Sequence, residues 1–241
     1  MNKGILNKKK EKFNDAELNL LNYQKALKHD KRNYIQYYFS LLRTKHLLIF
    51  SFFTFTDYNL RMIKIYIFFF TFGIEYSISA MFYTEELMHK IYQEEGSFDF
   101  IYQIPQMLYS SLLSTMLINI ITKFGLCENN ILTIKNCKYE NIQQTITKQQ
   151  FLIKVKIILF FVITYILLFA MWIYVGCFCA VYKNTQNHLL KEVLSSFGVS
   201  FITPLFINLI PGIFRIPSLK NRSKANRPIL YIFSKILQTI L

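Results

Sequence analysis

The residue in this chain most suited to chemistry is Glu75, whose carboxyl group lies inside an apolar run. An acidic side chain near the centre of a bilayer costs a few kcal/mol to insert, so it needs a partner, a proton or water. Lys64 cannot pair with it directly, because the intervening helix separates the two residues by about 16 Å. Two interpretations stay open: Glu75 handles protons or cations, or it makes a protonated or hydrogen-bonded structural contact between helices.

A second group of polar residues follows one face of the next apolar run. Gln103, Gln106, Ser110 and Ser114 recur at steps of three, four and four residues, which places them on the same side of a helix. Ser110 and Ser114 also form a small-xxx-small pair, which lets a neighbouring backbone approach closely. Together with Glu75, these four residues are the candidate intramembrane polar or ion-handling site.

The sequence carries no catalytic or metal-binding set beside them. The four histidines are scattered, the four cysteines form no CxxC pair, and no P-loop, GxSxG or dinucleotide fingerprint occurs. The Ser/His, paired-Asp or His/Asp sets that an intramembrane protease or acyltransferase needs are also missing from the apolar runs. We therefore expect no enzyme activity, no metal and no cofactor, and the sequence identifies no small-molecule substrate.

The elements that position these residues are four apolar runs, predicted to cross the membrane as helices at residues 63–83, 100–121, 157–182 and 193–214. A helix of about 20 apolar residues matches the roughly 30 Å hydrocarbon layer of a bilayer. The third run has little polarity, so more of it should face lipid. The sequence thus predicts an all-α membrane protein with a four-span domain over 62–215, in which 122–156 is a cytosolic loop.

The two flanking segments, 1–61 and 216–241, are basic and are predicted to carry amphipathic or interfacial helices. Residues 16–34 have an amphipathic pattern, and the C-terminal LYIFSKILQTIL is a second candidate of this kind. Residues 46–56, HLLIFSFFTFT, are apolar but too few to span a bilayer, so they suit an interfacial or re-entrant piece beside the first span.

Charge predicts the orientation of the chain. The net charge is +14, and 25 of the 28 Lys and Arg lie in the terminal segments, the loop 122–156 or the span edges that face them. The positive-inside rule then places both termini in the cytosol. Lys64, at the start of the first span, is expected to reach the headgroups by snorkelling. The loop 84–99 lies on the opposite side of the membrane and is the most acidic stretch of the chain. It either concentrates cations near the mouth of a pore or forms a solvated helix without a ligand.

The distribution of Lys and Arg also distinguishes the lipid bilayer from nucleic acid as the expected partner. A nucleic-acid-binding protein gathers its basic residues on a folded polar face. Here the basic residues flank apolar runs, and 53% of the chain is hydrophobic. The lipid bilayer is therefore the expected partner, and nucleic acid is not.

Five long strings between Arg32 and Leu219 carry a resemblance to known proteins. They are RNYIQYYFSLLRTKHLLIFSF, DYNLRMIKIYIFFF, HKIYQEEGSFDFIYQIPQMLYSSLLS, CFCAVYKNTQNHLLKEVLSSFG and LIPGIFRIPSL. They resemble the carboxy-terminal membrane module of large multipass proteins of single-celled eukaryotes, over most of residues 20–236. The resemblance implies a multipass membrane module and carries no established activity.

A more distant likeness involves the order of the spans. A basic stretch enters a span that ends in ISAMFY, residues 78–83, and a span with a polar and small face, a cytosolic insertion and two further spans follow. This order is similar to the early membrane spans of the receptor-like polycystins. The later spans, pore region and extracellular modules of that family have no counterpart here, so the likeness implies its non-pore part.

Two functions from different classes follow from these observations. The first is a structural or accessory membrane module of a larger assembly, with other membrane subunits or a second copy of the chain as partners. It rests on the missing catalytic sets and on small-residue faces suited to helix packing. The second is an ion channel or transporter component, which would use Glu75, the Gln103 and Gln106 face and the acidic outer loop.

Overall fold

The computed structural model describes residues 13–95, 99–135, 137, 142–181, 185–220 and 228–240. Every regular element over these residues is a helix, which confirms the predicted all-α class. Four helices are long and apolar enough to cross a membrane: α4 (Arg61–Met81), α6 (Phe100–Gly125), α8 (Ile142–Val181), and α9 (Thr185–Ile207) with its continuation α10 (Ile210–Lys220). By their length and composition, these helices are compatible with a multipass membrane protein.

The third helix is longer than the predicted span. α8 begins at Ile142 instead of 157, and α7 (Glu128–Lys135) occupies another part of the segment expected to be a loop. Hydropathy detects only the lipid-matched part of a helix, whereas the polar stretch that precedes it continues the same backbone hydrogen bonds. The predicted loop is therefore largely helical, although residues 136 and 138–141 lie outside the described residues, as does 182 at the predicted end of the span.

The fourth helix also starts earlier than predicted, at Thr185 instead of 193. It is interrupted at Asn208, where the carbonyl of Pro204 accepts hydrogen bonds from both the backbone and the side-chain nitrogen of Asn208. The earlier start has a consequence for chemistry, because it places His188 and Glu192 on a helix that packs in the bundle.

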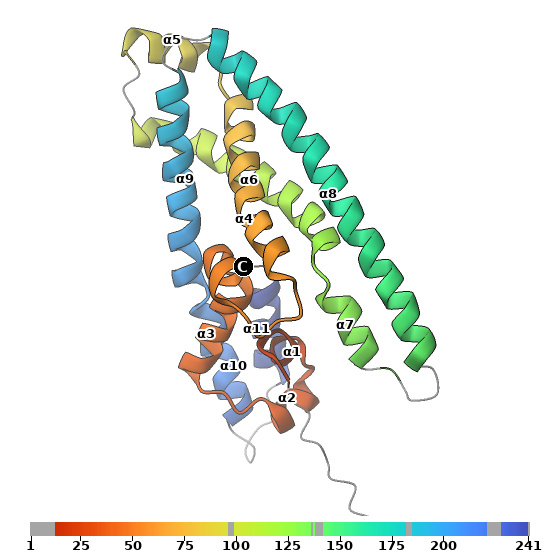
Figure 1. Ribbon diagram of the computed structural model, residues 1–241. Coiled ribbons are helices and arrows are strands. Elements are labelled where there is room, and N and C mark those ends of the chain that lie inside the picture. Colours follow the sequence, from red (N-terminus) through yellow and green to blue (C-terminus); the bar gives the residue numbers. More distant parts are fainter. Residues whose placement is uncertain are drawn as a thin grey trace, which may run out of the picture.

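Helix α4 lies in the middle of the bundle, beside α6, α8 and α9 (Figure 1). In its most apolar window 61% of the residues are buried, against 22%, 17% and 22% in the other three spans. The bundle core comprises Ile63, Ile67, Phe70, Ile74 and Ile78 of α4 with Ile121 of α6 and Phe160 and Met171 of α8. The low burial of α8 agrees with the expectation that more of this helix faces lipid.

The two ends of the bundle carry different elements. Figure 1 shows α5 (Glu85–Gln93) at one end and the short helices α1 (Asp15–Leu20) and α2 (Tyr23–His29) at the other, together with α7 and α11 (Pro228–Ile240). The N-terminal and C-terminal helices therefore share one end of the bundle. Residues 96–98, in the loop predicted to be acidic, lie outside the described residues, and so do 1–12, 221–227 and 241 of the terminal segments.

A buried ion pair joins the N-terminal helices to α10. Arg215 is fully buried, and its Nη2 donates to Asp30 Oδ2 and to the Leu18 carbonyl oxygen, both at 2.8 Å. Its guanidinium lies over the rings of Tyr37 and Tyr231, 4.9 and 4.8 Å from their centroids. Because Asp30 and Arg215 are 185 residues apart, this contact fixes the chain ends to each other.

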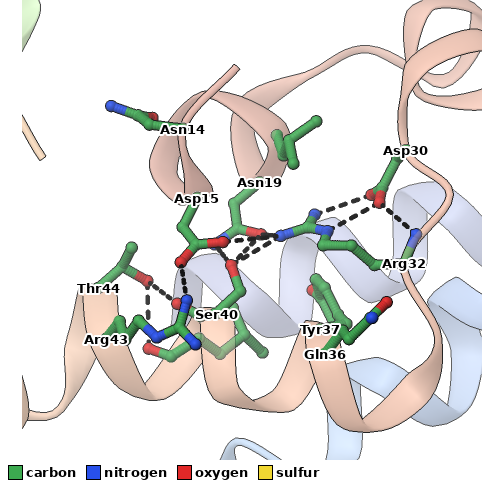
Figure 2. Close-up of polar contacts among 12 residues, drawn as sticks. Asn14, Asp15, Asn19, Asp30, Arg32, Gln36, Tyr37, Ser40, Arg43 and Thr44 are labelled. Atoms are coloured by element: carbon green, nitrogen blue, oxygen red, sulfur yellow. Dashed lines mark hydrogen bonds and ion pairs between the residues drawn. The ribbon is translucent and has the colours of Figure 1, made fainter. Parts of the chain in front are cut away.

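Asp30 also binds a second arginine on the same side of the molecule (Figure 2). Arg32 donates from Nε to Asp30 Oδ1 and from Nη2 to Asp30 Oδ2, both at 2.8 Å. The Nη1 of Arg32 reaches Asn19 of α1 at 3.0 Å and Ser40 of α3 (Tyr34–Lys45) at 2.7 Å. One carboxylate thus orders helices from both ends of the sequence.

We expect the Asp30 cluster to make folding sensitive to acid. Burial alone would raise the pKa of Asp30, but Arg32 and Arg215 outweigh it and hold the pKa below its ordinary value of 3.8. Because the folded-state pKa is the lower one, the carboxylate stabilises the fold fully above pH 3.8, and this contribution is lost as the pH falls through the folded-state pKa. Unfolding in mild detergent at a series of acidic pH values should show this loss.

The Asp30→Asn variant is the control for that experiment. It should be less stable than the wild type at neutral pH and should lose less stability on acidification. Parallel pH curves for the two proteins would contradict the assignment to Asp30.

The short apolar segment 46–56 folds back against the first span. A π-helical turn, Ile49–Phe53, packs between α3 and α4. The chain after it covers Lys64, whose Nζ donates to the Thr54 carbonyl oxygen at 2.6 Å and to Asp57 Oδ1 at 2.7 Å. The prediction that Lys64 snorkels to the headgroups is therefore wrong: this side chain is 1% exposed and has an internal counter-ion.

Candidate intramembrane site

Glu75 lies on the buried face of α4 and is 6% exposed. No hydrogen bond or ion pair holds its carboxyl group among the described residues, and its Oε2 is enclosed without a partner. A buried polar group without a partner is rare in folded proteins, so it calls for an explanation in terms of a ligand, water or function.

A cavity of about 360 Å³ lies beside this carboxyl group. Its walls come from one face of α6 and one face of α9, with Glu75 of α4 between them: Phe100, Ile104, Met107, Leu108, Ser111 and Thr115 on α6, and Ser196, Val199, Ser200, Thr203 and Pro204 on α9. The lining is therefore mostly apolar, and it also includes the Glu75 carboxyl group and hydroxyl groups from both helices.

The predicted polar face of α6 makes other contacts. Gln103 is buried, and its Nε2 lies 3.3 Å from Nε2 of His188 on α9. Nδ1 of the same imidazole lies 2.9 Å from the hydroxyl oxygen of Tyr83, just after α4. The ring of His188 thus connects three helical segments at the α5 end of the bundle.

A second carboxyl group completes this network. Glu192 of α9 is fully buried, and both of its oxygens lie 3.2 Å from Nε2 of Gln106. The hydroxyl of Tyr83 lies near the same carboxyl group and interacts with it electrostatically.

The donors and acceptors around His188 can be ordered consistently, although Gln103 Oε1 is buried without a partner among the described residues. If Gln103 donates to Nε2 of His188, the ring carries its proton on Nδ1 and donates it to the hydroxyl oxygen of Tyr83. Gln106 donates to the same carboxyl group. Each pair joins different helical segments, so the network links α4, α6 and α9.

The two serines of the predicted face serve close packing. Ser110 is buried, and its hydroxyl lies 3.3 Å from the hydroxyl of Ser79 on α4. Ser114 is buried too and donates to the Ser110 carbonyl oxygen at 2.7 Å within its own helix. The small side chains at these positions let α6 lie directly against α4.

The structure therefore divides the predicted site into two parts. Gln103, Gln106, Ser110 and Ser114 do share a polar side of α6, but none of them lines the cavity or bonds to Glu75. Different residues of α6, including Ser111 and Thr115, face the cavity.

The sequence reasoning missed Tyr83, His188 and Glu192. The last two stand four residues apart, with Ser196 four residues further, which is the spacing of one helical face. A predicted start at 193 left them in a loop, because charged residues at 191 and 192 ended the apolar run. Extending the helical periodicity of the fourth span to residues before 193 would have identified both His188 and Glu192.

No family model, no curated protein and no solved structure matches this chain. The resemblance to a membrane module of single-celled eukaryotes and the likeness to polycystins therefore stay predictions that rest on the quoted strings.

The chemistry of this region depends on its two buried carboxyl groups. Among the described residues, no group of three His, Cys, Asp or Glu side chains is arranged to hold a metal ion. Both oxygens of Glu192 accept hydrogen bonds from Gln106, whereas Glu75 lines a cavity and has a carboxyl oxygen without a partner among the described residues. The carboxyl group of Glu192 therefore suits a structural role, whereas that of Glu75 is available to bind a ligand.

Proposed function

We propose that this chain is a structural or accessory membrane module of a larger assembly and has no catalytic activity. The observation that carries the proposal is that polar groups of the spans bond to one another from helix to helix. The pairs are Gln103 with His188, Gln106 with Glu192, and Ser79 with Ser110. In lipid, such bonds and close packing replace the hydrophobic effect as the forces that hold helices together, each bond contributing about 0.6–2 kcal/mol.

The outer surface of the bundle supports a role in assembly. α8 exposes large apolar side chains along its length, among them Phe151 at 67%, Tyr165 at 70% and Trp172 at 67%. Lipid covers such a face in a membrane, and a second subunit can replace lipid at little cost because both are apolar. Other membrane subunits or a second copy of this chain are the partners that we propose.

The short terminal helices add a proposed contact with the bilayer surface. On α11 the exposed residues Ile229, Ile232, Phe233 and Ile236 follow the spacing of one helical face, while Tyr231 and Ser234 are buried against the protein. An exposed apolar face on a helix beside the bundle suits the membrane interface. We propose, with the charge distribution, that this end of the bundle and both termini are cytosolic.

A second candidate function rests on Glu75. Its enclosed, unpartnered carboxyl oxygen beside a cavity favours an ion channel or transporter component. The predicted polar face of α6 favours a continuous path less, since the amide nitrogens of Gln103 and Gln106 lie within hydrogen-bond distance of α9, although Gln103 Oε1 is buried without a partner among the described residues.

Reconstitution into liposomes separates the two functions. We expect proton and potassium flux no higher than in empty liposomes, and we expect the protein extracted in mild detergent to have more than the mass of one chain. A flux that Glu75→Gln abolishes and Glu192→Gln leaves intact would contradict the proposal and favour the transport function.

A further inference from the structure

We propose that the cavity between α6 and α9 binds an amphiphilic amine from the membrane, with its ammonium group at Glu75 and its alkyl chain along the apolar wall. This site is independent of the structural role proposed above, and it uses residues outside the Tyr83 network. Three observations support it: the unmet carboxyl group, the hydrogen-bonding character of the lining and the shape of the cavity.

The carboxyl group of Glu75 is the first observation. It is more than nine-tenths buried, faces the cavity, and has an oxygen that no described residue satisfies. Lys64 of the same helix, the nearest cation in sequence on the cytosolic side, is held by Asp57. A cationic ligand would therefore supply the counter-charge that the bundle itself does not provide.

The hydroxyl groups that line the same cavity as Glu75 are the second observation. Ser111, Ser200 and Thr203 donate their protons to the Leu108, Phe197 and Val199 carbonyl oxygens of their own helices. Their oxygen lone pairs remain for a ligand, so these three hydroxyl groups present acceptors to the cavity, as the Glu75 carboxylate does. A primary ammonium group has three donors and no acceptor, which matches this lining, whereas an alcohol has one donor and a carboxylate has none.

The shape of the cavity is the third observation. A volume of about 360 Å³ is that of a small-ligand pocket, since such pockets span roughly 300–1,000 Å³. Three residues of its apolar wall are partly open to the surface: Phe100 is 44% exposed, Leu108 63% and Val199 49%. In a bilayer these side chains face acyl chains, so a ligand can enter sideways from the lipid with its alkyl chain on this wall.

The test uses the full chain in nanodiscs of zwitterionic lipid, with radiolabelled dodecylamine as the probe. We expect saturable binding of one amine per chain, and Glu75→Gln should weaken it about tenfold or more because a charge-assisted contact becomes a neutral one. Dodecanol should compete weakly, and dodecanoate should not compete.

Glu192→Gln is the matched control, because it makes the same chemical change at a buried carboxyl group outside the cavity. Amine binding should remain as in the wild type. Val199→Trp is a second blocking variant, since it fills the mouth of the cavity from the α9 side and leaves Glu75 unchanged; it should abolish binding even if Glu75→Gln fails to fold.

Three results would overturn the inference. The first is amine uptake that never saturates. The second is equal binding by the wild type and both blocking variants. The third is dodecanol binding as tightly as the amine, because the site would then recognise an alkyl chain and not a cation. Each of these results can occur whether or not the chain conducts ions. Failure of the amine-binding proposal is therefore distinguishable from failure of the proposed structural function in the liposome test.

Discussion

Replacement of Asp30 with alanine is expected to lower the free energy of unfolding by about 3–5 kcal/mol, since loss of one partner leaves a buried charge uncompensated. The carboxylate is the counter-ion of Arg215, which is fully buried between two tyrosine rings, and of Arg32. Its removal leaves two guanidinium groups close together without a counter-charge between them. Denaturant- or SDS-driven unfolding in mild detergent measures the loss.

Asp15→Ala provides the matched control on the same group of helices. Asp15 is 2.8 Å from Arg43, whose side chain is 48% exposed, and 3.9 Å from Arg32, which keeps Asp30 as its counter-ion, so water and Asp30 replace the lost contacts. The expected cost is at most about 1 kcal/mol, as for other surface ion pairs. Equal losses in the two variants would show that the Asp30 cluster does not join the chain ends.

A second large effect is expected at the start of α4. Asp57→Ala removes the counter-ion of Lys64, whose ammonium group is buried beneath the segment 54–60. The expected loss is again about 3–5 kcal/mol. The ammonium group retains only the Thr54 carbonyl oxygen and the Phe50 ring, 5.1 Å from its centroid. The same unfolding measurement applies.

The double variant Asp57→Ala with Lys64→Met distinguishes a buried charge from general damage. Methionine keeps much of the volume of the lysine stem and removes the charge, and replacement of a buried ion pair by apolar residues is often neutral. Most of the lost stability should therefore return. A double variant that is as unstable as Asp57→Ala alone would mean that the segment before α4, and not the charge of Lys64, causes the loss.

The sequence was sufficient for the parts of the fold that depend on local composition. Apolar runs of the right length located all four spanning helices, and the three- and four-residue spacing from Gln103 to Ser114 placed those side chains on one side of α6. Both inferences use only the helical repeat and the thickness of the bilayer.

The remaining features depend on how the helices are rotated against each other. Nothing local in the sequence indicates that Gln103 meets His188, that α6 turns Ser111 toward Glu75, or that Asp30 meets Arg215. The expectation for Lys64 failed for the same reason, since a charged residue at a span edge can turn inward when a loop brings a counter-ion to it.

Site-directed labelling of single cysteines tests the membrane arrangement most directly. In a variant without Cys127, Cys137, Cys177 and Cys179, one cysteine is introduced by His89→Cys on α5 or by Gln24→Cys on α2, both exposed positions on helices that lie at opposite ends of the bundle. In sealed, uniformly oriented vesicles, a membrane-impermeant maleimide should label one of them at once and the other only after permeabilisation. Labelling of both from the same side, or release of the chain by an alkaline wash, would contradict the four-span arrangement.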